Sequence, residues 1–512
     1  MLFNSYEFIL LFLPIVLGLY YLGIFLGRAE FSRLTLLLGS LFFYGYWDMR
    51  YLPLLLFSIG FNYLIGRTIA AVQSPVLILN ASSAAPGSSA IALRLWPQSV
   101  AWPLNPSKAW LFVGISLNLL LLFTFKYSLF ALSTMEQLFG WTIAMPILTL
   151  PLGISFFTFT QIAFLVDAYH RKTETLTPTS YGLFVTVFPH LIAGPILHHR
   201  EMMGQFQDSN TYRWNTGCFS QGLVLFTMGL AKKVLIADPL APLVQRVFDV
   251  SNLVPTFLDA WGGAMAYTLQ LYFDFSGYSD MAIGLGLLFN MRLPINFDSP
   301  YKAKSIIEFW RRWHMTLSAF LRDYLYIPLG GNRGGQSSQM LNLFLTMLLG
   351  GLWHGAGWTF VLWGALQGVY LVINHLFRAK FHFPTAFSWP LTLFAVIVGW
   401  VIFRSVELDR ALTILQGMFG FNGIVLPVKT AQWLAQWPLL DTLSVLGGKI
   451  VFTRRELRWL LLLFVVVLTM PNSTALTKYV RPSRALGVGL ACVFVYCIMN
   501  FSHVSEFLYY QF

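Results

Sequence analysis

The stretch ILLFLPIVLGLYYLGIFLG, residues 9–27, contains no charged side chain. A helix of this length crosses the roughly 30 Å hydrocarbon layer of a membrane. The first basic residue is Arg28, so no positively charged region precedes the apolar run as it would in a cleavable signal peptide. We therefore expect the stretch to be the first membrane-spanning helix. Three further charge-free runs have similar length: 109–125, 383–403 and 485–501.

The composition of the whole chain supports the same interpretation. Of the 512 residues, 57% are hydrophobic and only 11% are charged, whereas about a quarter of a soluble protein is charged. The net charge of +12 could indicate a nucleic-acid partner, but no stacking or zinc module accompanies the basic residues. Basic residues that flank membrane helices favour the cytoplasmic side and the lipid headgroups. We predict membrane lipid, and no nucleic acid, as the partner of these charges.

The chain is organised as one membrane domain over residues 1–512, without an internal repeat. We predict an all-α, polytopic fold with about 11 to 13 spanning or re-entrant helices. Residues 72–107, rich in Ser, Ala and Pro, are a predicted loop insertion, and residues 421–453 are a second predicted loop. Residues 270–380 contain the motifs described next and form the predicted catalytic core.

Basic clusters include Lys232 with Lys233, and the densest is a series from Arg292 to Arg333. Positive-inside logic places the Arg292–Arg333 series at the cytoplasmic face, and the same arginines can also anchor helices at the lipid headgroups.

The first motif is FWRRWHMTLSAFLRDYLYIPLGGNRGG, residues 309–335. If it is a helix from about Lys304, His314 shares a face with Trp310, Leu317 and Leu321, and Glu308 and Arg312 form an i, i+4 pair. A lone histidine on such an apolar face is more often structural than catalytic. The glycines that follow break the helix, and irregular backbone at membrane depth is tolerated only against protein or a water-filled cavity. We therefore expect this segment to line a cavity.

The second motif is GGLWHGAGW, residues 350–358, which ends one apolar helix and begins another. It places His354 beside Trp353 and among glycines. An ionisable side chain at membrane depth is costly and is by default a functional candidate. An imidazole there suits general-base chemistry on a hydroxyl.

A third stretch, LYFDFSGYSDMAIG, carries Asp274, Tyr278 and Asp280 within an apolar segment. Its carboxylates could orient a histidine, bind a cation or hold a helix break at Gly277. His190, in VFPHLIAGPI, could line the same cavity. There is no HExxH or CxxC metal motif, no GxSxG nucleophile elbow and no P-loop. We predict no metal site, no bound cofactor and no covalent Ser or Cys nucleophile.

These three stretches, together with LPLGISFFTFTQIAFLVDAYHR (residues 150–171) and the closing FLYYQF, resemble the membrane-bound O-acyltransferase family, in particular its bacterial alginate O-acetylation branch. The resemblance implies a helical fold with a central tunnel in the bacterial inner membrane. It implies that His354 is the family's invariant histidine and that His314 matches its second catalytic position, which is His or Asn. Further tunnel or supporting residues are expected at Trp313, Trp353 and Arg311, besides Asp274, Tyr278, Asp280 and His190.

The resemblance also implies substrates and partners. The acyl donor is expected to be acetyl-CoA or another cytosolic acyl carrier, whose phosphates the basic loops would attract. The acceptor is expected to be an exported polysaccharide, reached directly or through a periplasmic partner that resembles SGNH hydrolases. Two other classes of protein remain open: a transporter or export channel, although its typical repeated halves are missing, and a non-catalytic scaffold that recruits the periplasmic enzyme.

Overall fold

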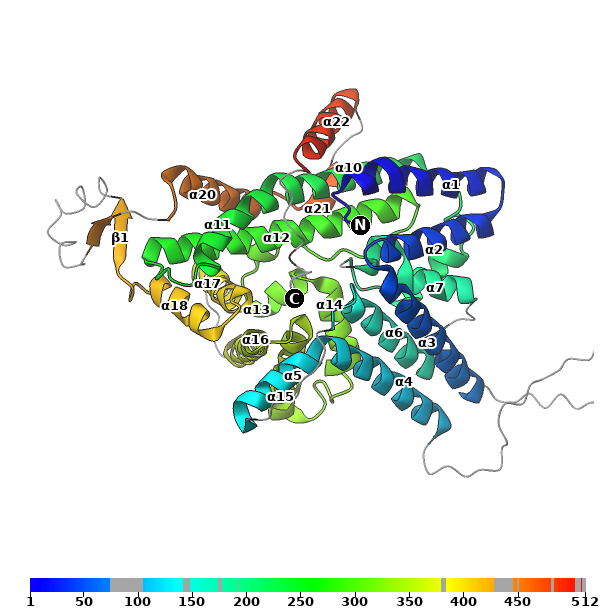
Figure 1. The fold of residues 1–512 in the computed structure, drawn as a ribbon, viewed down its shortest axis with the longest axis horizontal. Coiled ribbons are helices and arrows are strands. Elements are labelled where there is room, and N and C mark those ends of the chain that lie inside the picture. The colour runs from blue at the N-terminus through cyan, green and yellow to red at the C-terminus, as the bar shows by residue number, and fades with distance from the viewer. Residues whose placement is uncertain are drawn as a thin grey trace, which may run out of the picture.

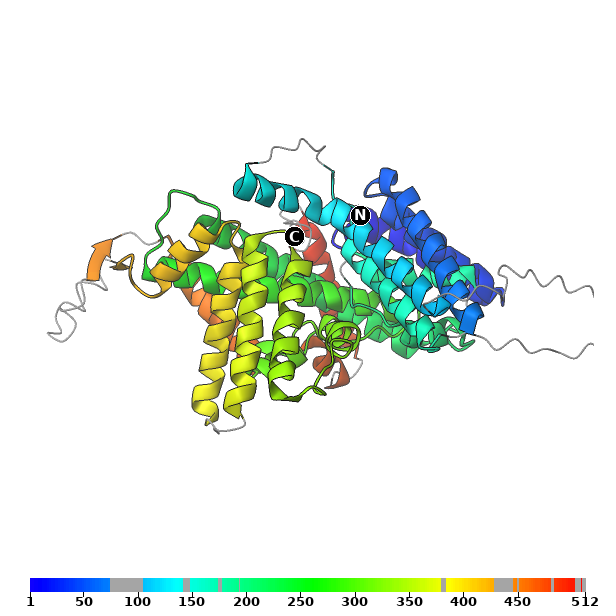
Figure 2. The ribbon, with the colours of Figure 1, turned by 90° about the horizontal axis from the view of Figure 1, so that it is seen from below.

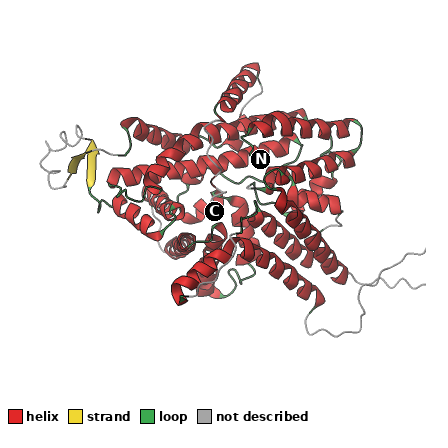
Figure 3. Cartoon of the chain, viewed as in Figure 1, coloured by secondary structure: helices red, strands yellow, loops and turns green. Residues whose placement is uncertain are grey.

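The computed structural model describes residues 1–73, 105–140, 148–173, 177–192, 194–378, 384–427, 445–448, 451–479, 483–501 and 508. Helices dominate this part of the chain (Figures 1 and 3). A short parallel pair of strands, β1 (Ile424–Pro427) and β2 (Val445–Gly448), projects at one edge. The predicted loop at 421–453 contains this pair, and most of the predicted 72–107 insertion lies outside the described residues.

The N-terminal helices form one side of the molecule, coloured blue to cyan in Figure 1. Within it, α1 packs on α2, α3 on α4, and α6 on both α3 and α4. Their bounds are η1 Glu7–Phe12, α1 Leu13–Phe25, α2 Ala29–Gly45, η2 Met49–Tyr51, α3 Leu52–Gln73, α4 Pro106–Leu122, η3 Phe123–Tyr127, α5 Ser128–Phe139, α6 Ile154–Tyr169, α7 Pro178–Thr186, α8 Phe188–Leu191 and α9 His199–Gln207.

The centre of the fold is the long helix α12 (Phe257–Leu288), which is buried along nearly its whole length. It packs on α10 (Thr216–Ala231) and α11 (Asp238–Phe248), which a π-helical segment, η4 (Lys232–Ala237), joins. Glycines let α10 and α12 approach closely: a Cβ on Gly229 would lie 2.5 Å from the carbonyl oxygen of Gly277, and one on Gly222 would lie 2.8 Å from that of Gly284. Small residues at a helix contact are the usual way that membrane helices pack tightly.

The C-terminal half contributes long helices that lie side by side, seen in green and yellow in Figure 2. Helix α15 packs on α16, and α16 packs on α17. The elements are η5 Pro300–Lys302, α13 Ile306–Arg312, α14 Met315–Leu321, η6 Arg322–Tyr326, α15 Gly335–His354, α16 Trp358–Arg378, α17 Thr385–Arg404, α18 Leu408–Met418, α20 Arg454–Thr469, α21 Ser473–Tyr479 and α22 Arg484–Met499.

The helical membrane fold predicted from the sequence is confirmed, with the short β1–β2 pair as an addition. Five helical stretches of the described chain are long and apolar enough to cross a membrane: Glu7–Phe25, Met49–Gln73, Pro106–Phe139, Trp358–Phe377 and Thr385–Arg404. Shorter apolar helices, Ile154–Tyr169 and Arg484–Met499, add to them. The large hydrophobic side chains left exposed on these helices, such as Phe25, Phe57 and Phe112, are suited to contact with lipid.

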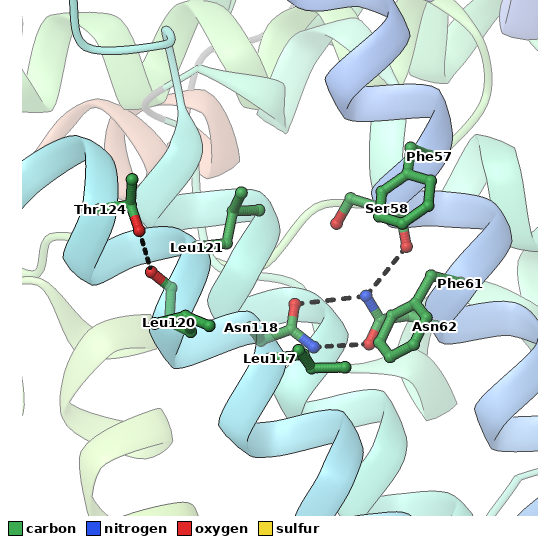
Figure 4. Close-up of a pocket in the computed structure, with 9 residues that line it drawn as sticks. All are labelled: Phe57, Ser58, Phe61, Asn62, Leu117, Asn118, Leu120, Leu121 and Thr124. Atoms are coloured by element: carbon green, nitrogen blue, oxygen red, sulfur yellow. Dashed lines mark hydrogen bonds between the residues drawn. The ribbon is translucent and has the colours of Figure 1, made fainter. Parts of the chain in front are cut away.

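A cavity of about 270 Å³ lies between α3 and α4 (Figure 4). Its polar floor is a reciprocal pair of side-chain amides: Asn62 Nδ2 donates to Asn118 Oδ1 at 3.2 Å, and Asn118 Nδ2 donates to Asn62 Oδ1 at 2.6 Å. The rest of the lining is mostly apolar, and neither His314 nor His354 contributes to it. The Asn pair joins two helices and is not part of the predicted catalytic core.

The basic pair Lys232–Lys233 is turned inward and binds carboxylates of the helical core. Lys233 Nζ lies 2.5 Å from Asp274 and 2.8 Å from Asp238, with all three side chains buried. Lys232 Nζ lies 2.6 Å from Asp280, whose Oδ2 also accepts a hydrogen bond from Ser473. The carboxylates of α12 draw the two lysines inward, because a buried carboxylate requires a counter-charge.

We predict that Lys233→Met strongly destabilises the fold. The substitution takes the positive charge away from Asp238 and Asp274, and breaking a buried ion pair costs about 3–5 kcal/mol. Arg246→Met is the matched control, because the Arg246–Glu456 ion pair is partly exposed and such pairs contribute about 0–1 kcal/mol. Thermal unfolding of the two purified variants in detergent checks the difference. Equal melting temperatures would contradict a structural role for the buried pair.

Candidate active site

His314 lies at a break between two short helices, not within one continuous helix. Helix α13 ends at Arg312, and His314 adopts the left-handed conformation (φ 44°, ψ 54°) immediately before α14. The predicted helix through residues 304–321 is therefore wrong, and with it the shared face of His314 and Trp310. The predicted pair of Glu308 with Arg312 is present at 2.8 Å, within α13.

The break is held by Asn296, which the sequence analysis did not identify. Its side-chain oxygen lies 3.1 Å from His314 Nδ1 and accepts hydrogen bonds from the backbone N–H and the hydroxyl of Thr316. Its backbone carbonyl accepts a hydrogen bond from Met315 N–H at 3.0 Å. The loop after α12 therefore supplies the acceptors that the interrupted helix needs.

These contacts define the tautomer of His314. The Asn296 atom that accepts from a backbone N–H is an oxygen, so the imidazole must donate to it through Nδ1–H. In the neutral ring, Nε2 then carries the lone pair. His314 is oriented as an acceptor or a base at Nε2.

His354 is the last residue of α15, as the glycine pattern predicted. Helices α15 and α16 touch backbone to backbone here: a Cβ on Gly351 would lie 2.5 Å from the carbonyl oxygen of Phe360, and one on Gly364 would lie 2.7 Å from that of Met347. This close contact fixes α15 against α16 about one turn before His354.

The two histidine rings lie near each other, with centroids 6.5 Å apart, and both are buried. Aromatic rings enclose them. Trp353, Trp363 and Phe403 lie 4.9, 5.2 and 5.3 Å from the ring of His354, and Phe275 lies 4.8 Å from the ring of His314. Two imidazoles from separate motifs thus share one apolar environment, where an electrostatic contact is stronger than in water.

Two of the predicted supporting residues belong to the walls around this pair. Trp353 contributes its ring directly, and Trp313 is buried against Phe297, Phe309 and Trp400. Because Trp400 stacks on Trp363, Trp313 supports the wall from behind.

The other predicted residues have different surroundings. Asp274 and Asp280 are paired with the buried lysines, and Tyr278 stacks on Phe3 at 4.7 Å. Arg311 is exposed on α13. These carboxylates do not hydrogen-bond either histidine in the described structure.

His190 is buried in α8. The segment that follows it reaches the site, because Ile196 N–H donates to the hydroxyl of Thr316 at 3.0 Å. In the described residues, no group of three or more His, Cys, Asp or Glu side chains could hold a metal ion.

Comparison with known proteins identifies the family. Residues 107–406, which include both histidines, match the family model of membrane-bound O-acyltransferases. The chain belongs to this family. It is therefore a membrane-embedded acyltransferase that transfers an acyl group to oxygen, as the sequence resemblance implied.

Several curated relatives are similar over most of the chain. The peptidoglycan O-acetyltransferase of Helicobacter pylori is 38% identical over 551 residues, which cover 100% of this chain and 98% of the relative. The probable alginate O-acetylase AlgI of Azotobacter vinelandii is 41% identical, covering 91% of this chain and 84% of the relative. The protein of the same name from Pseudomonas aeruginosa is 42% identical, with 82% and 75% covered.

We predict that Asn296→Leu lowers acyl transfer by about tenfold or more, because it leaves buried donors of His314 and Thr316 without their acceptor, at a cost of about 1–3 kcal/mol. Asn296→Asp keeps an oxygen at this position and should retain more activity than Asn296→Leu. Transfer rates per amount of folded protein check the order. Equal activity of both variants would contradict the role of the Asn296 oxygen.

Proposed function

We propose that this protein transfers an acetyl group from a cytosolic thioester, such as acetyl-CoA, to hydroxyl groups of a polysaccharide outside the bacterial inner membrane. The observation that carries the proposal is the pair of buried histidines, 6.5 Å apart, at two helix breaks. The names of the relatives support the acetyl group and the polysaccharide, because they include a peptidoglycan O-acetyltransferase and alginate O-acetylases.

In this proposal His354 is the general base. Its imidazole takes the proton of the acceptor hydroxyl while the hydroxyl oxygen bonds to the carbonyl carbon of the thioester. The carbon–sulfur bond then breaks, and the proton passes to the departing thiolate. A positioned base of this kind contributes about 10²–10⁴-fold to the rate.

His314 has the second role. Two functions follow from its place beside His354: orienting the acceptor hydroxyl, or steadying the oxyanion that forms on the carbonyl. Nδ1–H donates to Asn296, so Nε2 of the neutral ring has no proton to give to an oxyanion. This argument favours the orienting role, in which Nε2 accepts a hydrogen bond from the hydroxyl.

The surroundings of the histidines suit a thioester reaction. Aromatic side chains surround both buried imidazoles, and a site shielded from water protects a thioester from hydrolysis. The sequence resemblance leaves two routes to the polymer open, direct transfer and transfer through a periplasmic partner. We further propose the second route, in which an SGNH-hydrolase-like partner receives the acetyl group on its serine before the polymer does. The hydroxyl that meets His354 would then belong to this partner.

We predict that His354→Ala and His314→Gly abolish O-acetylation. Glycine is chosen at position 314 because it accepts the positive φ of the native backbone. His375→Ala is the matched control, since His375 hydrogen-bonds only the carbonyl of Leu371 in its own helix in the described structure. The measurement is ester-linked acetate, released by mild alkali from peptidoglycan and from exported polysaccharide separately, in a gene-deletion strain complemented with each variant.

At equal membrane levels, we expect acetate near the deletion background for the two site variants and wild-type acetate for His375→Ala. The polymer that loses acetate is the acceptor. Full acetylation with both site variants would overturn the assignment and favour a scaffold or an export channel. Labelled acetyl ester on a partner serine, found when the polymer is absent, would support the relay.

A further inference from the structure

The C-terminal end of α15 has backbone carbonyl groups that need hydrogen-bond partners from outside the helix. The last carbonyl groups of any helix have no partner within the helix, and where they are buried they need a hydrogen-bond donor from elsewhere in the protein. In α15 these groups include those of Leu352, Trp353 and His354, the residue proposed as the general base. Donor groups elsewhere in the protein must therefore hydrogen-bond to these carbonyl oxygens.

Two adjacent side chains from a distant segment satisfy all three carbonyls. The hydroxyl of Tyr127 donates to the oxygen of Leu352 at 2.9 Å. The ammonium group of Lys126 donates to the oxygens of Trp353 at 2.6 Å and His354 at 3.1 Å. Both residues belong to the π-helical segment η3, more than two hundred positions away in the sequence.

The third N–H of the Lys126 ammonium group donates to the hydroxyl oxygen of Ser155 on α6, at a distance of 3.4 Å from Nζ. Among the described residues, Lys126 forms no ion pair with a carboxylate. Its countercharge is the negative end of the α15 dipole, which a cation stabilises. The bond is strengthened by the apolar surroundings.

Packing alone does not hold this helix end on the side of Lys126. A cavity of about 110 Å³ lies there, and Lys126, Ser155, Trp353 and residues 150–154 line part of it. On the other side, Trp353 stacks on Phe159 at 5.3 Å. The hydrogen bonds from η3 therefore restrain the end of α15 on the side where packing is incomplete.

We propose that Lys126 and Tyr127 are positioning residues that fix His354 in its catalytic orientation, an inference that rests on the proposed function. They act on the backbone that carries the imidazole and do not touch the substrate. A displacement of the helix end by about 1 Å is enough to cost about 10²-fold in rate. The π-helical form of η3 agrees with this role, since such segments are frequent at functional sites.

The test compares Lys126→Met, Lys126→Arg and Tyr127→Phe in the complemented deletion strain, with ester-linked acetate expressed per amount of heat-stable folded protein. Lys126→Met keeps the length of the side chain but removes all donors, and we expect a loss of about tenfold or more. Lys126→Arg keeps a cationic donor, and the adjoining cavity admits the larger group, so it should restore several times the activity of Lys126→Met. Tyr127→Phe removes one donor and should have an intermediate effect.

Lys108→Met is the matched control, because Lys108 is exposed at the start of α4, the helix that leads into η3, and it should acetylate like the wild type. Wild-type acetylation per folded protein by Lys126→Met and Tyr127→Phe, with His354→Ala inactive, would overturn the inference and leave the proposed function intact. Acetylation that persists in His354→Ala would overturn the proposed function itself. If Lys126→Met does not fold, the comparison of Lys126→Arg, Tyr127→Phe and Lys108→Met decides, and equal acetylation by all three overturns the inference.

Discussion

The structure depends on one constraint: backbone groups that water does not reach must find their hydrogen-bond partners within the protein. Every interruption of a helix in an apolar environment exposes N–H and C=O groups that the protein itself must satisfy. The two histidines both lie at such interruptions, and each interruption is satisfied from a distance. Asn296 supplies acceptors where α14 begins, and Lys126 with Tyr127 supplies donors where α15 ends. The site is therefore held together by hydrogen bonds between segments that are remote in sequence.

Lysines within π-helical segments recur in the described structure. Lys126 lies in η3, and Lys232 and Lys233 lie in η4. All three ammonium groups bind other parts of the fold: one binds the end of α15, and two bind the carboxylates of α12. A wider helical turn thus accompanies an inward basic residue in both segments. Through them, the N-terminal helices and α10 are tied to the helices that form the core of the molecule.

Much of the fold could be predicted from the sequence because apolar length and glycine are local signals. The charge-free runs identified three of the five long apolar stretches, and the glycines around residues 350–357 identified the end of α15 at His354. The pair of histidines followed from their motifs and from the family resemblance. The pairing of Glu308 with Arg312 required only the helical repeat. Each of these features depends on residues that are close together in the chain.

The remaining features depend on tertiary contacts. The motif around His314 contains no glycine or proline at the break, since the interruption is stabilised by Asn296 from a loop 18 positions earlier. Lys232 and Lys233 look like an ordinary basic cluster in the sequence, and only the α12 carboxylates reveal that both turn inward. Lys126 stands at the end of an apolar run and gives no sequence signal of its contact with α15. A hydrogen bond between residues that are far apart in the chain produces no periodic pattern in the sequence, so it cannot be predicted from such a pattern.

The left-handed backbone at His314 also restricts which side chains can replace histidine at this position during evolution. Among residues with a side chain, Asn, Asp and His are those that occupy positive φ most readily, so the backbone at residue 314 restricts substitution before any chemistry is selected. A lineage that changes this residue while keeping the break is left with few side chains, and Asn combines backbone tolerance with a polar group that can bind a hydroxyl. The alternation between His and Asn that the family resemblance implies at this position is thus what the backbone alone would permit.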